Sequence, residues 1–334
     1  MHGHEAEVPL TKLSILDLVR VRENGTPRQA LDDSRSVIQH AEALGFERYW
    51  VAEHHNMPGI ASAATAVVIA HLAQATSRIR VGAGGIMLPN HAPIVIAEQF
   101  GTLAQLHPGR IDLGLGRAPG TDQPTMRALR RSLANSDNFP QDVQELQHYF
   151  SAEQQPGQIQ AVPAAGTEVP LWILGSSTYG AQLAAHLGLP YGFASHFAPD
   201  LLRDALAIYR THYRPSAQCP QPYAMVGVNI IAADSDAEAR RLATTQQMSF
   251  ADLLRGARRL SRPPIDDIEA YWSPVEKAQA QRMLACSIVG SPDTVRAGIR
   301  SLIAETGADE LMIVSDVYDL TARKHSLAIV ADSL

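Results

Sequence analysis

The chain has 334 residues, of which 46% are hydrophobic, and its 28 basic and 34 acidic side chains give a formal net charge of −6. This length can bury a large core, and the charge balance gives no sign of the strongly basic patch that marks nucleic-acid binding. The two cysteines, Cys219 and Cys286, fit neither a zinc spacing nor a CxxC pair, and so few thiols suit a reducing compartment. No apolar run reaches the ~18 residues of a membrane span, and residues 1–21 lack the apolar core of a signal peptide. We therefore expect a cytoplasmic protein that acts on a small molecule, with no nucleic-acid or membrane partner.

Strand-like and helix-like runs alternate along the chain. In chain order, the strand-like runs are Leu13 to Val21, Phe46 to Ala52, Ile79 to Leu88, Arg110 to Leu115, Leu171 to Leu174, Tyr191 to Ala194, Tyr223 to Ala233 and Glu310 to Ser315. Helical patterns follow them, at 31–44, 62–75, 96–106, 178–187, 200–213, 292–306 and the end of the chain. Ser291 and Pro292 predict one helix start, as an N-cap and a proline at the first helical position. The alternation lapses in two irregular regions, about 118–169 and about 235–288, and the second of these is charged and mostly helical.

Eight strands that are each followed by a helix predict a parallel sheet. Because no composition break or long linker divides the chain, we expect one α/β domain over residues 1–334. The favoured architecture is a (β/α)8 TIM barrel with insertions at about 118–169 and 235–288, and an open, doubly wound sheet is the alternative. In a barrel, the active site lies in the loops that follow the strands.

Glycines near the ends of the third and fourth strands do not form a nicotinamide site. The run 82–85 would need a further glycine at position 87 to make a dinucleotide fingerprint, and Met87 stands there. The glycines at 114 and 116 fail the same test at Pro119. Three glycines in four residues indicate instead a bend, or the close approach of a ligand to the backbone.

The segment Leu174-Gly175-Ser176-Ser177-Thr178 ends the fifth strand and opens a helix. Free backbone N–H groups and hydroxyls at such a helix start can bind a phosphate, and capping of the helix by the same hydroxyls is the alternative. Arg117, at the end of the fourth strand, could supply a cationic partner, or could simply be a solvated side chain.

Two adjacent histidines, His54 and His55, follow the second strand. Neighbouring residues of a strand point to opposite faces, so one metal ion cannot easily bind both, and we expect no metal site. One of them could face the barrel mouth as an acid–base or hydrogen-bonding group, because histidine titrates near neutral pH. A structural role is the alternative.

Taken together, these loops resemble those of the luciferase-like flavin-dependent oxidoreductases, over essentially the whole chain. The resemblance rests on five runs in order: YWVAEHHN (49–56), VGAGGIMLPNHAP (81–93), AEQFGTLAQLHPGRIDLGLGRAPG (97–120), LGSSTYG (174–180) and VGSPDTVRAGI (289–299). It implies an FMN-using barrel, typically a homodimer, that receives reduced flavin from a separate reductase. It also implies a monooxygenase that uses O2 to oxygenate a small organic substrate through a C4a-peroxyflavin.

The resemblance also implies roles for single residues. His54 matches the first histidine of a motif that is important to catalysis in bacterial luciferase, and so becomes a candidate general acid or base. The pair Gly84-Gly85 matches a non-proline cis peptide beneath the flavin ring, Arg117 and 176–178 match the phosphate-binding region, and 194–197 match a segment that lines the pocket. The residues assigned to cofactor binding are Ala83, Gly84, Gly85, Arg117, Leu174, Gly175, Ser176, Ser177, Thr178, Ala194 and Ser195.

One position departs from luciferase proper. Gly116 stands where the luciferase catalytic subunit has a reactive cysteine, which disfavours light emission and places the chain nearer the non-luminescent, single-gene members. Two other functions stay open: hydride transfer with the deazaflavin F420, and flavin binding without turnover. The motifs do not fix the substrate, since a long-chain aldehyde, an alkanesulfonate-like molecule or an intermediate of a secondary pathway would leave the same pattern. Residues 235–288 are expected to form a lid or substrate wall.

Overall fold

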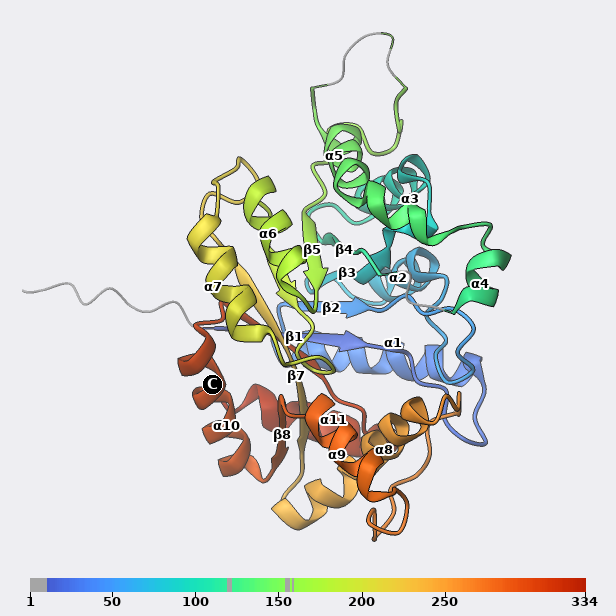
Figure 1. The fold of residues 1–334 in the computed structure, drawn as a ribbon, viewed down its shortest axis with the longest axis vertical. Helices are drawn as coiled ribbons and strands as arrows, with labels where there is room; N and C mark the ends of the chain where they lie inside the picture. Colours follow the sequence, from blue (N-terminus) through green and yellow to red (C-terminus); the bar gives the residue numbers. More distant parts are fainter. Residues whose placement is uncertain (1–10, 119–121, 154–156, 158) are drawn as a thin grey trace, which may run out of the picture.

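The structure is a computed structural model that describes residues 11–118, 122–153, 157 and 159–334. Residues 1–10 of the N-terminal segment considered as a signal peptide, and Pro119, lie outside these residues. Eight parallel strands close into a barrel surrounded by helices, because β6 pairs with β7 and β9 pairs with β1 (Figure 1). This confirms the predicted (β/α)8 barrel and excludes the open sheet.

The barrel strands begin and end close to the predicted positions. They are β1 (Lys12–Asp17), β2 (Arg48–Val51), β3 (Arg80–Met87), β4 (Ile111–Gly116), β5 (Leu171–Gly175), β6 (Tyr191–Phe193), β7 (Ala224–Ala232) and β9 (Glu310–Val314). A further strand, β8 (Ser287–Gly290), was not predicted: the sequence interpretation placed these residues at the end of an irregular region. The pairing of β7 with β9 ends at Asn229, but β7 continues to Ala232. β8 forms because it pairs with this continuation, residues Asn229–Ala232 of β7.

Helices cover the outside of the barrel and build the two insertions. They are α1 (Pro27–Ala43), α2 (Thr65–Gln74), α3 (Pro93–Leu106), α4 (Gln123–Ala128), α5 (Phe139–Phe150), α6 (Thr178–Leu187), α7 (Leu202–His212), α8 (Asp236–Leu254), α9 (Pro274–Met283), α10 (Pro292–Thr306) and α11 (Leu320–Ala331), with short 3-10 helices η1 (Leu88–Asn90) and η2 (Leu133–Asn138). The N-cap of α10 is Ser291 and its first residue is Pro292, as predicted. Among the described helices, none is long and apolar enough to cross a membrane.

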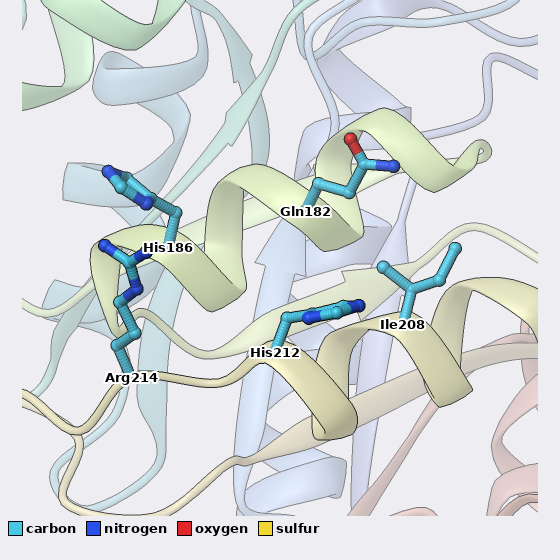
Figure 2. Close-up of a pocket in the computed structure, with 5 residues that line it drawn as sticks. All are labelled: Gln182, His186, Ile208, His212 and Arg214. Atoms are coloured by element: carbon cyan, nitrogen blue, oxygen red, sulfur yellow. The ribbon is translucent and has the colours of Figure 1, made fainter.

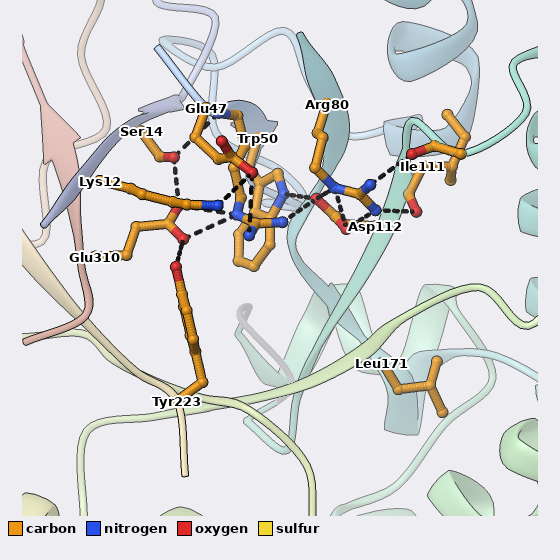
Figure 3. Close-up of polar contacts among 12 residues, drawn as sticks. Lys12, Ser14, Glu47, Trp50, Arg80, Ile111, Asp112, Leu171, Tyr223 and Glu310 are labelled. Atoms are coloured by element: carbon orange, nitrogen blue, oxygen red, sulfur yellow. Dashed lines mark hydrogen bonds and ion pairs between the residues drawn. The ribbon is translucent and has the colours of Figure 1, made fainter. Parts of the chain in front are cut away.

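A buried ionic network fills the end of the barrel where the strands begin (Figure 3). Arg48 is its centre: Nε donates to Glu310 at 2.8 Å, and Nη1 donates to Asp112 at 2.9 Å. Both carboxylates are fully buried, so each must be paired to be tolerated there. Further donors to these two carboxylates are Ser14, Trp50, Arg80 and Tyr223. The network closes this end of the barrel, so a ligand can approach only from the mouth at the carboxyl ends of the strands.

Candidate active site

The two adjacent histidines after β2 have different surroundings. Strand alternation turns Trp50 and Ala52 toward the barrel interior, and the same alternation carries His54 to the mouth. The side chain of His54 is half-buried, and it lies close enough to His196 to shift the pKa of that ring. His55 is turned away and bonds to Glu53 instead. The structure thus separates the two side chains, as the sequence argument expected.

Glu53 forms the centre of a cluster that we call the Glu53 clasp, made of Glu53, His55 and His91. His55 Nε2 lies 2.7 Å from Glu53 Oε1, and His91 Nε2 lies 2.9 Å from the same oxygen. The backbone N–H of Met87 donates to Glu53 Oε2 at 2.9 Å. The clasp therefore joins the end of β2 to the end of β3 and to the residue after η1, and fixes the loops on either side of His54.

The charge state of the clasp follows from these contacts. Burial alone would raise the pKa of Glu53, but hydrogen bonds from His55, His91 and the Met87 amide outweigh it and lower the pKa to about 2. The bond to Glu53 raises the pKa of His55, against a smaller opposing effect of burial. The carboxylate is thus ionised across the physiological range without any lysine or arginine partner in the described contacts.

Among the described residues, the side chains of the clasp could also hold a metal ion. They offer one carboxylate oxygen and two imidazole nitrogens, which lie within 4.8 Å of one another. In this structure those atoms are engaged in hydrogen bonds with one another. The contacts are complete without an ion, and we interpret the cluster as a structural clasp.

Replacing Glu53 by glutamine should destabilise the protein most between about pH 4.5 and pH 6.5, the ordinary pKa values of the two groups. Glu53 stabilises the fold as an anion, so its contribution is lost as the pH falls toward its lowered pKa. His55 contributes as a cation, so its contribution is lost as the pH rises through its raised pKa. We expect a loss of about 1–3 kcal/mol within the window. Urea unfolding of both proteins at several pH values measures it, and a difference that does not vary with pH would contradict the ionic pairing.

Gly84 and Gly85 interrupt β3 at the level of the mouth, and the peptide bond between them is cis, as the resemblance implied. A Cβ on Gly84 would lie 2.7 Å from Leu16 Cδ1, and one on Gly85 would lie 2.7 Å from the carbonyl oxygen of Gly114. Packing of the barrel interior therefore requires glycine at both positions. The side chain of the neighbouring Ala83 is fully buried in the core between strands and helices, so only its backbone can face a ligand.

The end of β4 and the start of α6 converge. The Arg117 guanidinium carbon lies 4.4 Å from the centre of the Tyr179 ring, in the first turn of α6. Arg117 is 44% exposed, and its polar contacts with the described residues are a 3.3 Å bond to the carbonyl of Ser136 and a distant approach to Asp137. The N-cap residue Ser177 makes no side-chain hydrogen bond to its own helix. A cation and uncommitted donors therefore meet at 176–178, which favours anion binding over simple capping at Ser177.

The segment after β6 was expected to bind the cofactor through Ala194 and Ser195, but the Ser195 side chain is engaged elsewhere. Ser195 is fully buried and its hydroxyl donates to the carbonyl of Gly227 at 2.6 Å, so the hydroxyl joins β6 to β7 and cannot reach a ligand in this structure. Ala194 lies at the next inward position after Gly192 and is half-buried. Leu174 and Gly175 are also partly accessible, at the end of β5.

The insertion at 235–288 reaches the loops that follow β2 and β4. Arg258 donates to the carbonyl of Asn56 at 2.9 Å and pairs with Asp122. Asn56 Nδ2 in turn donates to Asp122 Oδ2 at 3.4 Å. Residues from both insertions therefore meet beside the histidine-bearing loop, as a substrate wall would require.

A groove lies elsewhere on the described surface, between α6 and α7 (Figure 2). It has a volume of about 540 Å³, and it is lined by Gln182, His186, Ile208, His212 and Arg214. His186 and His212 stand in the last turns of their helices, which is the end of the barrel where the strands begin. The groove is therefore remote from the mouth and takes no part in the site.

Comparison with known proteins decides the family. The family model described as luciferase-like monooxygenase matches residues 11–310. The chain belongs to this family. A luciferase-like monooxygenase of Escherichia coli K12 is 52% identical over 320 residues, which cover 96% of each chain. The crystal structure of apo-MsnO8 superposes with a TM-score of 0.89 at 35% identity, over 97% of this chain and 98% of that one.

More distant structures show the fold alone. The oxygenating constituent of the 3,6-diketocamphane monooxygenase of Pseudomonas putida, solved with FMN, has a TM-score of 0.71 at 20% identity and covers 96% of both chains. An F420-dependent secondary alcohol dehydrogenase has a TM-score of 0.72 at 16% identity, over 97% of this chain and 98% of that one. The family assignment makes this luciferase-like chain a flavin-dependent oxidoreductase, and the choice between related cofactors is a separate question.

Sequence reasoning missed two features of the mouth. One is the Glu53 clasp, because His91 lies far from His55 in sequence and only the closed barrel brings them together. The other is His196, which was grouped with the segment 194–197 and not considered singly. His196 lies in the turn 195–197, beyond the end of β6 at Phe193, so no strand pattern could have singled it out.

Proposed function

We propose that the chain is an FMN-dependent monooxygenase that uses reduced FMN and O2 to oxygenate a small organic substrate. One observation carries the proposal: Arg117 and the start of α6 converge beside a barrel mouth that contains the cis Gly84–Gly85 bond and His54. The family assignment supplies the chemistry and the geometry supplies a place for the cofactor.

The residues at the mouth fit a flavin mononucleotide. The phosphate would lie at 176–178, where N–H groups of α6 point outward from the helix start and Arg117 can approach. The isoalloxazine ring would lie against the backbone of Gly84 and Gly85, which themselves have no side chain and pack closely against Leu16 and Leu174. When bound, reduced FMN supplies the reaction with oxygen, for which the family resemblance implies a C4a-peroxyflavin.

The protein contributes position, proton exchange and exclusion of water. His54 stands at the mouth and could accept or donate a proton beside the bound ring. The Glu53 clasp holds the backbone on both sides of it. The contact of Arg258 with Asn56 and Asp122 closes one side of the mouth, which would limit access of water to a reactive intermediate.

Two partners belong to the proposal. The sequence has no nicotinamide fingerprint, so a separate reductase would have to supply the reduced flavin. The family resemblance favours a homodimer, and sedimentation velocity of the purified protein would test the assembly state.

Replacing Arg117 by alanine should weaken the binding of reduced FMN by about 1.5–3 kcal/mol, because one charge-assisted hydrogen bond to phosphate is lost. Anaerobic titration followed by flavin absorbance measures the change. Riboflavin, which lacks the phosphate, serves as the matched control and should bind wild type and variant equally. If the two proteins bind FMN with equal affinity, the phosphate does not bind at Arg117. If the protein binds F420 in preference to FMN, hydride transfer becomes the favoured function.

A further inference from the structure

A second histidine lies at the mouth, in the turn that follows the strand opposite β2 in the ring. β6 ends at Phe193, and His196 lies three residues beyond it, in the turn 195–197, where it is partly exposed. Its ring lies over Gly227 of β7, where an added Cβ would be 2.5 Å from the ring Nδ1. Glycine at position 227 therefore leaves the space that this imidazole occupies.

Buried hydrogen bonds fix the backbone of His196. Asn229 Nδ2 donates to the carbonyl of His196 at 2.6 Å, and Gln246 of α8 donates to Asn229 Oδ1 at 2.8 Å. One residue earlier, the Ser195 hydroxyl bonds to Gly227. The side chains of Ser195, Asn229 and Gln246 are all buried. The insertion that contains α8 is thus coupled to His196, and the ring has a defined position.

The His196 ring packs edge-on against Phe197, but one of its nitrogens is unsatisfied. Nδ1 is enclosed by protein beside Gly227 and makes no hydrogen bond among the described residues, which costs free energy and is uncommon in native structures. The residue nevertheless retains accessible surface, and since Nδ1 is enclosed, Nε2 is the ring nitrogen that can reach a ligand. His54 is near enough for its charge to act on this ring. Because β2 and β6 are four strands apart in the barrel, the two imidazoles approach the mouth from opposite sides.

We propose that His196 is a second active-site imidazole, which faces His54 across the mouth and hydrogen-bonds, through Nε2, the polar group of the substrate held between them. The pairing of the two rings rests on the opposite positions of β2 and β6 and on the effect of His54 on His196, whereas the contact with substrate rests on the proposed function. The class of ligand is a small organic molecule with a hydrogen-bonding group at the atom near the flavin.

The electrostatic surroundings agree with an uncharged ring. Burial, and secondly the charge of His54, lower the pKa of His196 to about 4. The other polar groups that pack near the ring, from β6, β7 and the residue before β8, are Ser195, Asn229 and the Cys286 thiol. None of them is charged at neutral pH, since burial raises the pKa of Cys286. His196 therefore keeps one donor and one acceptor there.

The pairing can be tested without flavin. Histidine resonances of the ligand-free protein are followed by NMR from pH 3.5 to pH 8 in wild type, and assigned with His196→Phe. We expect His196 to titrate well below the other histidines, and its pKa to rise in His54→Gln, which removes the neighbouring charge. An ordinary pKa for His196, or a pKa that does not respond to His54→Gln, would show that the rings do not face each other and would overturn the proposal.

The contact with substrate is tested on the same variants loaded with reduced FMN. His196→Phe keeps a ring of similar shape and should bind reduced FMN within twofold of wild type, while product formed per O2 consumed falls at least tenfold. His196→Gln places an amide near the Nε2 position and should recover part of the loss. If His196→Phe gives the same product yield as wild type, or if its only effect is weaker FMN binding, His196 does not contact the substrate. Failure of wild type to bind reduced FMN at all would instead count against the proposed function, and would leave the pairing result standing.

Discussion

Replacing His54 by alanine is expected to lower product formation by about 10²- to 10⁴-fold, the usual contribution of a positioned acid or base. His54 is the histidine of the pair that faces the mouth, and it is half-buried there beside His196. The affinity for reduced FMN should remain close to that of wild type, because the phosphate would be held at 176–178 and Arg117. The measurement is product formed from the first compound that a screen of aldehydes and sulfonates shows to be oxygenated, together with anaerobic FMN titration.

The matched control is His212→Ala. His212 is an exposed histidine at the end of α7, remote from the mouth, and its loss should leave both measurements unchanged. Wild-type product formation by His54→Ala would assign His54 a structural role. A large loss of FMN affinity would place the residue in cofactor binding instead of proton exchange.

The second large effect concerns stability. Replacing Arg48 by methionine should lower the free energy of unfolding by about 3–5 kcal/mol, because it leaves two buried carboxylates without their shared cation. Arg48 joins Glu310 and Asp112 inside the barrel. Without it Asp112 keeps Arg80, whereas Glu310 keeps only the neutral donors Ser14 and Tyr223 among the described contacts. Urea unfolding, monitored by tryptophan fluorescence and circular dichroism, measures the loss.

Arg28→Met provides the comparison for this experiment. Arg28 pairs with Asp32 one helical turn away on α1, and both side chains are well exposed. Removal of such a surface pair should cost less than about 1 kcal/mol. Equal stabilities of the two variants would show that the network at the base of the barrel contributes little. If Arg48→Met does not fold, Arg48→Lys keeps the charge and should fall between it and wild type.

The barrel was predictable because its local signals agree. The apolar run 171–173 and the run 310–314 are buried parts of strands. The helices α6 and α10 begin and end where the helical pattern and the Ser291–Pro292 signal placed them. The unpredicted β8 depends on a tertiary circumstance: the overhang of β7 beyond its barrel neighbour, which no local pattern in 287–290 reveals.

The sequence predicted which loops form the site, but not the side-chain contacts between those loops. Alternation along β2 correctly separated His54 from His55, and the ends of β4 and β5 converge as expected. The role of Ser195 could not be deduced, because its hydroxyl bonds to Gly227, 32 positions away in sequence. The same holds for the bond between Glu53 and His91. Such contacts depend on the distances between strand ends in the closed barrel, and these distances cannot be derived from the sequence.

The most direct test of the account is to form the anaerobic complex with reduced FMN and then mix it with oxygenated buffer in a stopped-flow spectrometer. The account predicts saturable binding, followed by an absorbance phase of an oxygenated flavin that outlasts the reaction of free reduced FMN, and that ends in product when substrate is present. Absence of saturable binding, or reoxidation at the rate of free flavin with and without candidate substrates, would contradict the monooxygenase assignment.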